Sequence, residues 1–186
     1  VRHKLKPFNV DESEYIRILE VFQKYNIRYF FYNGGNDSMD TCNKISKYLQ
    51  SQNYECRIIG IPKTIDNDLF GTDHCPGFGS AAKYVATSLM ELYLDTHVYD
   101  TGIVLIVEVM GRNAGWLTAA STLGAPQGFG PDLIYLPEIP FDVDDFIEDV
   151  KNVAARKNNK VIAVISEGIK DQSGKYISEY LVSLKR

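Results

Sequence analysis

Short apolar runs alternate with segments of helical periodicity along most of the chain, and this alternation narrows the possible folds more than any other feature. Four apolar runs have the length of strands: residues 27–32, 57–61, 102–109 and 160–165. Between them apolar residues recur at helical spacing, as at Met39, Cys42, Ile45 and Leu49. Strands that alternate with helices form a largely parallel sheet. The sequence therefore predicts an α/β fold.

The same patterns give more local expectations. Helices are predicted at residues 79–95, 113–122 and 142–157, with a short strand at 133–136. The run at 27–32 is interpreted as a buried strand, and Trp116, among Ala and Leu, as a core residue. Residues 73–78 contain Pro76 and Gly77 and are interpreted as a crossover between two Rossmann-like lobes.

Composition excludes several classes of function. The 186 residues are 45% hydrophobic and carry a net charge of −4 with scattered Lys and Arg, which argues against a nucleic-acid binder. No apolar run approaches the ~20 residues that span a bilayer, so no membrane association is expected. The three cysteines have no metal-ligand spacing, which favours free thiols in a reducing, cytoplasmic environment.

Polar loops follow four of the predicted strands. They are Gly34–Ser38, Pro62–Asp68, Met110–Arg112 and Ser166–Gly168. In open parallel sheets, ligands bind outside the carboxyl ends of the strands. The four loops are therefore expected to line one cleft.

The loop at 62–68 has the sharpest chemistry. Lys63, Thr64, Asp66 and Asp68 place a cation, a hydroxyl and two carboxylates within six residues. Phosphoryl transfer needs a base for the attacking hydroxyl, a carboxylate for Mg²⁺ and cations for the developing charge. The alternative is an Asn/Asp-rich surface turn, which is less expected directly after an apolar strand.

The other loops are individually weaker signals. Gly34 and Gly35, before a predicted helix, suit a phosphate, although a plain strand-to-helix turn explains them equally well when they are taken alone. No Gly-Lys-Ser/Thr follows, so a Walker A nucleotide site is not supported. Arg112 offers a fork for phosphate oxygens and Glu167 an acceptor for a sugar hydroxyl, but either alone is an ordinary surface residue.

Five runs together resemble the phosphofructokinase family in order and approximate spacing. They are Gly-Gly-Asn-Asp-Ser (34–38), Pro-Lys-Thr-Ile-Asp-Asn-Asp (62–68), Pro-Gly-Phe-Gly-Ser-Ala (76–81), Glu-Val-Met-Gly-Arg (108–112) and Ile-Ser-Glu-Gly (165–168). The resemblance covers nearly the whole chain from about Arg2. It implies an incomplete phosphofructokinase fold, with residues 1–77 in a donor-binding lobe and 78–186 in a lobe that binds fructose 6-phosphate.

The resemblance also implies an activity: transfer of a phosphoryl group to the 1-hydroxyl of fructose 6-phosphate, giving fructose 1,6-bisphosphate in glycolysis, with Mg²⁺ as cofactor. By resemblance, Asp66 is the base, Lys63, Thr64 and Arg112 assist transfer, and Asp37 and Asp68 hold the metal. The implied substrate-binding residues are Gly35, Asp37, Thr64, Ile65, Asp66, Met110, Gly111, Arg112 and Glu167. Arg2 is expected on the donor side.

Two departures from the family bear on the phosphoryl donor. They are Asp37 and Lys63, which stand where ATP-using members commonly have glycines. As a separate departure, Asn36 replaces a usual carboxylate, whose work Asp37 is expected to take over. A carboxylate would repel a nucleotide's α-phosphate, whereas an ammonium group suits a compact anion. Pyrophosphate is the expected donor, with ATP as the alternative and a non-catalytic regulatory subunit as the rival from another class.

Assembly and completeness are expectations from the same resemblance. The family forms homo-oligomers, and an arginine that reaches the neighbouring subunit's sugar phosphate is here Ile103. The family's upstream Gly-rich loop and its C-terminal sugar-phosphate ligands have no counterpart, so the chain is expected to be a central fragment, inactive by itself.

Overall fold

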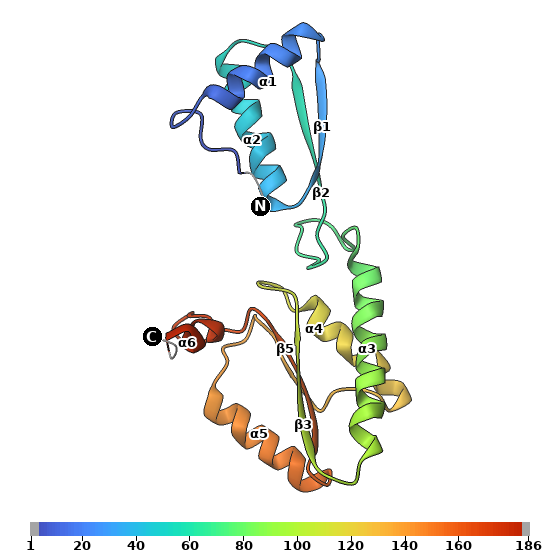
Figure 1. Cartoon of the computed structure of the whole chain (residues 1–186). Helices are drawn as coiled ribbons and strands as arrows, with labels where there is room; N and C mark the ends of the chain where they lie inside the picture. Colours follow the sequence, from blue (N-terminus) through green and yellow to red (C-terminus); the bar gives the residue numbers. More distant parts are fainter. Residues whose placement is uncertain (1–3, 184–186) are drawn as a thin grey trace. The chain divides into compact units, whose positions relative to one another are not determined.

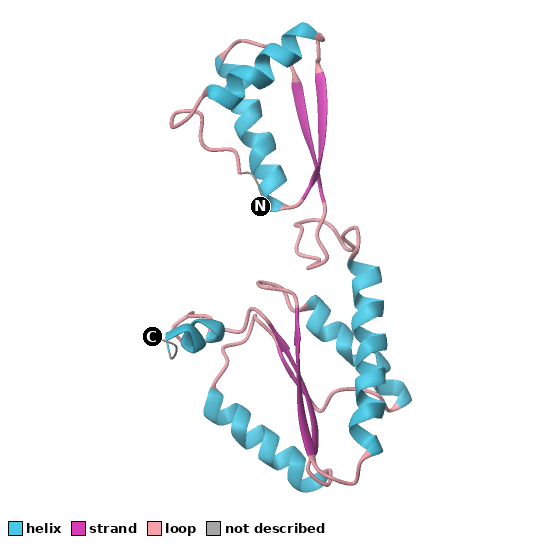
Figure 2. Ribbon diagram, viewed as in Figure 1, coloured by secondary structure: helices cyan, strands magenta, loops and turns pink. Residues whose placement is uncertain are grey.

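The computed structural model describes residues 4–183 of the chain, and the backbone alone for the last three of these. The chain forms two compact units, which divide between Lys63 and Thr64. Each unit contains its own parallel sheet (Figures 1 and 2). The predicted α/β fold with parallel strands is therefore confirmed.

The first unit packs two helices on a two-stranded sheet. Its elements in order are α1 (Ser13–Lys24), β1 (Tyr29–Gly34), α2 (Asn36–Ser51) and β2 (Arg57–Pro62). β1 and β2 run parallel, with Phe30 opposite Ile58. Both side chains pack against a buried cluster from the helices that includes Tyr15, Tyr48 and Leu49.

The prediction that residues 27–32 form a buried strand is wrong about burial. Tyr29 is 67% exposed and Phe31 is 59% exposed. Successive strand residues point to opposite faces of a sheet, and Phe30 between them points into the helical cluster. Tyr29 and Phe31 therefore belong to the sheet face that α1 and α2 leave uncovered.

Asparagine marks the C-terminal end of three helices. Asn26, Asn53 and Asn158 follow the last turns of α1, α2 and α5 (Val143–Arg156) and have φ angles of 52°, 52° and 50°. After α1 the next amide, that of Ile27, donates to the carbonyl of Phe22 at 2.8 Å. This is a Schellman-type ending with Asn in the position where Gly is commonest.

The second unit contains a three-stranded parallel sheet in the order β3-β5-β4. Its elements in chain order are α3 (Phe78–Val98), β3 (Ile103–Val109), α4 (Trp116–Ala120), the 3₁₀-helix η1 (Ser121–Gln127), β4 (Leu133–Tyr135), α5, β5 (Lys160–Ser166) and α6 (Ile177–Ser183). The central strand β5 is the most buried, and its Ile162 and Val164 pack with Leu89 of α3 and Leu117 of α4.

Two expectations for this unit need correction. The helix predicted at 113–122 begins only at Trp116 and continues beyond Ala120 as a 3₁₀-helix. Trp116 is 55% exposed and not a core residue, because it is the first residue of the helix and its ring contacts Phe78 edge-on, with 6.4 Å between centroids.

The helix predicted at 142–157 is confirmed, and the carboxylate of Asp142 caps it by accepting a hydrogen bond from the amide of Asp144 at 2.8 Å.

The boundary between the compact units differs from the predicted division between residues 77 and 78. Residues 64–77 group with the second unit, and Ile65 packs against its core. The assignment of a ligand to each lobe stays a prediction. Within residues 4–183, no helix is long and apolar enough to cross a membrane.

Candidate active site

In the first unit, the loop after β1 meets the end of β2. The amide of Lys63 donates to the carbonyl of Gly34 at 3.0 Å, which fixes the end of β2 beside the Gly34–Gly35 turn. A Cβ atom on Gly35 would lie 3.9 Å from Lys63 Nζ, so the ammonium group lies over this turn. Gly35 is also the N-cap residue of α2. An ammonium group and a helix N-terminus of this length together favour an anion.

Asp37 lies in the first turn of α2 and is exposed. Its Oδ1 is 3.0 Å from Lys4 Nζ, and the hydrogen bond from Lys4 to this carboxylate raises the pKa of Lys4. Lys4 was not among the predicted site residues. It lies in a basic segment of the sequence, but only the fold shows that it reaches the turn that carries Asp37.

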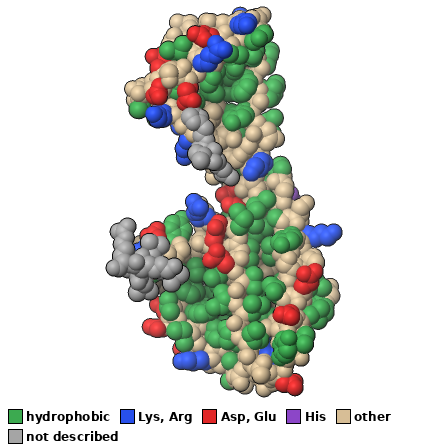
Figure 3. Space-filling model, viewed as in Figure 1, with side chains coloured by type: hydrophobic (Ala, Val, Ile, Leu, Met, Phe, Trp, Pro, Cys, Tyr) green, Lys and Arg blue, Asp and Glu red, His purple; other side chains and the backbone are tan. Residues whose placement is uncertain are grey.

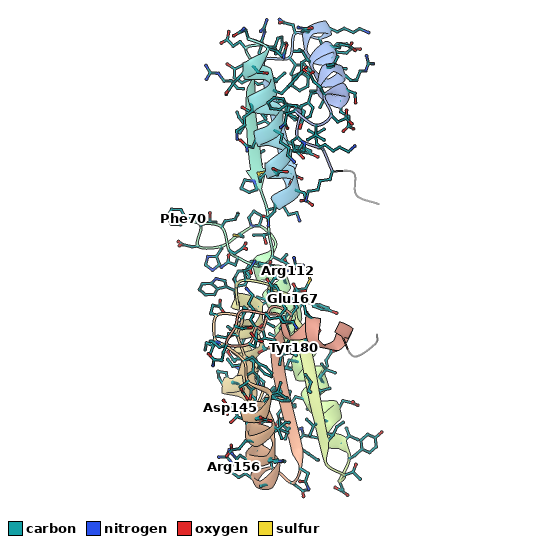
Figure 4. The ribbon with its side chains drawn as sticks, turned by 90° about the vertical axis from the view of Figure 1, so that its left-hand side faces the viewer. Phe70, Arg112, Asp145, Arg156, Glu167 and Tyr180 are labelled. Atoms are coloured by element: carbon teal, nitrogen blue, oxygen red, sulfur yellow. The ribbon has the colours of Figure 1, made fainter. Side chains whose placement is uncertain are left out.

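The segment after Lys63 begins the second unit and is organised by its own polar side chains. Thr64 Oγ1 accepts the amide of Asp66 at 3.1 Å, so the threonine hydroxyl shapes the turn on which Asp66 is presented. Asp66 is half-buried and Asp68 is exposed. Further along the same loop Phe70 is fully exposed and projects from the molecule (Figure 4).

Asn67, between the two carboxylates, is a residue that the sequence reasoning missed. It is only 6% exposed and has a φ of 59°. Its side chain donates to the carbonyl of Asp73 at 3.1 Å and accepts the amide of Cys75 at 2.8 Å. Asn67 thereby closes the loop that follows Asp66. An asparagine between two aspartates was the available signal, because Asn tolerates left-handed backbone and bonds to nearby main chain.

The predicted Mg²⁺ ligands, Asp37 and Asp68, are both carboxylates on the protein surface. Among residues 4–183 there is no group of three His, Cys, Asp or Glu side chains that could hold a metal ion. Mg²⁺ is usually bound through one or two carboxylates, with substrate phosphates and water completing the octahedron. Asp37 in the first unit and Asp68 in the second each present an exposed carboxylate of the kind that binds Mg²⁺. Their role as ligands stays a prediction.

The turn after β3 is held tightly. Gly111 has a φ of 129°, and a Cβ atom there would lie 2.4 Å from the carbonyl oxygen of Ala114. The position therefore requires glycine. The amide of Gly111 donates to Glu167 Oε1 at 3.3 Å, while the side chains of Met110 and Arg112 on either side are exposed.

The turn after β5 packs directly on the turn after β3. The amide of Glu167 donates to the carbonyl of Val109 at 2.9 Å. A Cβ atom on Gly168 would lie 1.8 Å from the carbonyl oxygen of Arg112, so the two backbones touch at this point. Arg112 and Glu167 consequently lie close together at one end of the sheet (Figure 4).

An apolar cavity of about 250 Å³ lies beside this turn, between α3 and the sheet. Ile65 and Met110 both line it, together with Tyr84 and Leu89 of α3 and Val164 of β5. Hydrophobic side chains are also prominent on the visible face of this unit (Figure 3). The cavity brings the segment after Lys63 and the turn after β3 to the same place.

Most of the predicted site residues fall into two groups, one in each unit. Thr64, Asp66 and Asp68 lie on the segment that begins the second unit and are not placed in either group. The first unit brings together Gly35, Asp37 and Lys63. The second unit brings together Met110, Gly111, Arg112 and Glu167, with Ile65 at the shared cavity. A single cleft lined by all four loops stays a prediction. Arg2 lies outside the described residues.

Comparison with known proteins identifies similar sequences over nearly the whole chain. The chain is 48% identical over 181 residues to a pyrophosphate–fructose 6-phosphate 1-phosphotransferase of Xanthomonas campestris pv. campestris, covering 96% of this chain and 43% of the relative. It is 52% identical over 161 residues to the protein of that name in Rhodospirillum rubrum, covering 86% of this chain and 39% of the relative. The chain therefore spans about two fifths of the length of these relatives.

Solved structures give the same result for the fold. The crystal structure of a pyrophosphate-dependent phosphofructokinase from Nitrosospira multiformis matches with a TM-score of 0.78 and 42% identity, over 94% of this chain and 45% of that chain. Residues 2–185 also match the sequence pattern of the family described as phosphofructokinase. With the fold, the turns and the sequence in agreement over nearly its whole length, the chain belongs to the phosphofructokinase family.

Proposed function

We propose that this protein transfers a phosphoryl group from pyrophosphate to the 1-hydroxyl of fructose 6-phosphate. The observation that carries the proposal is the similarity of almost the whole chain to relatives named for that reaction. The site residues support it, because Lys63, Thr64, Asp66, Asp68 and Arg112 are all present and lie on the turns that follow the strands.

Each residue has a role that its chemistry allows. Asp66, presented on the turn that Thr64 stabilises, accepts the proton of the sugar 1-hydroxyl. The exposed guanidinium of Arg112 stabilises the negative charge that develops on the transferring group. Met110, Gly111 and Glu167 form the sugar side, where Glu167 has one carboxylate oxygen bonded to the Gly111 amide and accepts from the sugar with the other.

Magnesium, bound through Asp68 and Asp37, would neutralise the phosphate charge as it does in other phosphoryl-transfer sites. Two lysines of the first unit also bear on the charges near the phosphates. Lys63 lies over the Gly35 turn, and Lys4 balances Asp37 at 3.0 Å. The first unit therefore offers the Lys63 ammonium group and a helix N-terminus to an anion.

The choice of pyrophosphate over ATP rests on Lys63 and Asp37. The Lys63 ammonium group lies beside Gly35, and the Asp37 carboxylate is exposed in the first turn of α2. A donor without a nucleoside is held by charge alone, which suits Lys63, whereas Asp37 repels an additional phosphate. ATP is the alternative donor.

Further inferences concern the whole protein. The two units are interpreted as incomplete parts of a donor-binding lobe and a sugar-binding lobe, and the whole protein as a homo-oligomer that works in cytoplasmic glycolysis. The free thiols of Cys42, Cys56 and Cys75 support a reducing compartment.

The test is an assay of the whole protein with fructose 6-phosphate, Mg²⁺ and either donor at equal concentration. We expect turnover with pyrophosphate and little with ATP. Asp66→Ser should lower kcat by ~10²–10⁴-fold, the usual contribution of a general base. Asp73→Ser, an exposed aspartate of the same loop, is the matched control and should leave kcat unchanged.

Three outcomes would contradict the proposal in different ways. ATP-supported turnover without pyrophosphate activity would refute the donor. A wild-type kcat in Asp66→Ser would remove Asp66 from the mechanism. Binding of fructose 6-phosphate without turnover of either donor would favour the regulatory subunit. For the donor itself, the paired variant Asp37→Gly, Lys63→Gly should lose pyrophosphate activity and gain modest ATP use.

A further inference from the structure

We infer that Ser166 is a positioning residue, which fixes the turn that carries Arg112 against the turn that carries Glu167. The inference rests on the proposed function, because it assigns to Ser166 the spacing of two proposed site residues. Ser166 is the last residue of β5 and is not one of the residues predicted for the site.

One hydroxyl group joins the two turns. Ser166 Oγ donates to the carbonyl of Gly111 at 2.6 Å, across 55 positions of sequence. The same oxygen accepts the amide of Gly168 at 3.0 Å. A serine hydroxyl can donate one hydrogen bond and also accept one, and Ser166 does both here.

The proposed site residues are the direct neighbours of these bonded groups. Arg112 follows Gly111, and Glu167 lies between Ser166 and Gly168. The two backbones are in direct contact at this point, because a Cβ atom added to Gly168 would collide with the carbonyl oxygen of Arg112. A shift of the Gly111 carbonyl therefore moves Arg112 directly.

Burial makes the link strong and excludes a role in direct contact with ligand. Ser166 is 1% exposed, so water does not compete for its two hydrogen bonds. The side chains it positions are accessible, since Arg112 is exposed and Glu167 half-buried. Ser166 thus acts through its neighbours.

Ser121 provides a control for the ordinary role of a buried serine. It is also 1% exposed, and its Oγ donates to the carbonyl of Thr118 within the α4–η1 segment. That hydrogen bond is local and connects no two turns of the site. Replacing either serine by alanine removes a buried hydroxyl, but only Ser166→Ala removes a hydrogen bond between the two turns.

The experiment measures kcat and KM of the whole protein with its active donor. Ser166→Ala should lower kcat/KM for fructose 6-phosphate by about 10–10²-fold, the effect of a misplacement of about 1 Å. Ser121→Ala should keep the wild-type value while showing a similar loss of melting temperature. Ser166→Cys keeps a weaker donor and should give an intermediate value, and it carries the test if Ser166→Ala does not fold.

A double-mutant cycle tests whether Ser166 acts through Arg112. With Arg112→Ala already in place, Ser166→Ala should have much less further effect on kcat than in the wild type. An undiminished effect in that background, or a wild-type kcat/KM in Ser166→Ala, would overturn the inference.

Amide hydrogen exchange separates failure of this inference from failure of the proposed function. In Ser166→Ala, but not in Ser121→Ala, the amide of Gly168, which donates to Ser166 Oγ, and the amide of Gly111, which donates to Glu167, should exchange faster than in the wild type. This readout does not depend on catalysis, so an inactive wild type would refute the function alone. Unchanged exchange at both amides would overturn the role of Ser166 whatever the activity.

Discussion

Replacing Gly168 with alanine would test the close approach of the two site turns most directly. The added methyl group would lie 1.8 Å from the carbonyl oxygen of Arg112 and 2.5 Å from its carbon, whereas ordinary contact begins at 3.4 Å. Both atoms belong to the backbone, so no side-chain rotation relieves the clash. The turns must separate by roughly 1.5 Å in a packed region.

The expected cost follows from what this separation breaks. Overpacking costs about 1–3 kcal/mol, and the hydrogen bond from Ser166 to Gly111 contributes about 1 kcal/mol. We therefore expect a loss of about 2–4 kcal/mol, which lowers the melting temperature by about 5–15 °C for a domain of this size. Turnover should fall by about 10²-fold, because Arg112 moves with its carbonyl.

Calorimetric melting of the wild type and two glycine variants provides the assay. Gly79→Ala is the matched control, since Gly79 lies in α3 with no atom within 4 Å of the added methyl group. Alanine favours helix, so this variant should melt at the wild-type temperature or slightly above it. If Gly168→Ala melts together with Gly79→Ala and the wild type, the reasoning about the turn contact is refuted.

Three other measurements test individual side chains. Asn67→Ala should lower the free energy of unfolding by about 2–4 kcal/mol, because two hydrogen bonds are lost and alanine must adopt a positive φ. Urea unfolding measures this, and an unchanged midpoint would contradict it. Thr118 Oγ1 is buried without a hydrogen-bond partner among the described residues. Thr118→Val should therefore raise the free energy of unfolding by up to about 1 kcal/mol, and a clear decrease would contradict the absence of a partner. Burial raises the pKa of the Cys42 thiol, so less thiolate forms at a given pH. Iodoacetamide should therefore label Cys42 more slowly near neutral pH than it labels cysteine in solution, and an equal rate would contradict this.

Elements with local causes were predictable from sequence. The apolar run at 102–109 and the helix at 142–157 are close to β3 and α5 as observed, because periodicity and an N-cap residue act within a few residues. The length of an apolar run does not show how many sheet faces are covered. That is why the burial of Tyr29 and Phe31 was mispredicted.

The sequence predicts which residues form the candidate site, and that choice stays a prediction, but it does not predict the contacts between the turns. Spacing and residue type identify Arg112 and Glu167, since polar residues after parallel strands belong to one edge of the sheet. The hydroxyl of Ser166 bonds to a carbonyl 55 positions away, and Lys4 reaches Asp37 from outside the motif. Such partners depend on tertiary packing, which leaves no periodic signal in the sequence.

The asparagines at the helix ends have a consequence for the unfolded chain. Every non-glycine residue with positive φ among residues 4–183 is an asparagine: Asn26, Asn53, Asn67, Asn158 and Asn159. Glycine would adopt this conformation without strain, but it would add backbone freedom to the denatured ensemble and raise the entropy lost on folding. The chain accepts mild strain at each helix end and has a less flexible unfolded state. Asn→Gly exchanges at Asn26, Asn53 and Asn158 should therefore leave the free energy of unfolding nearly unchanged, while its entropic and enthalpic parts change in opposite directions.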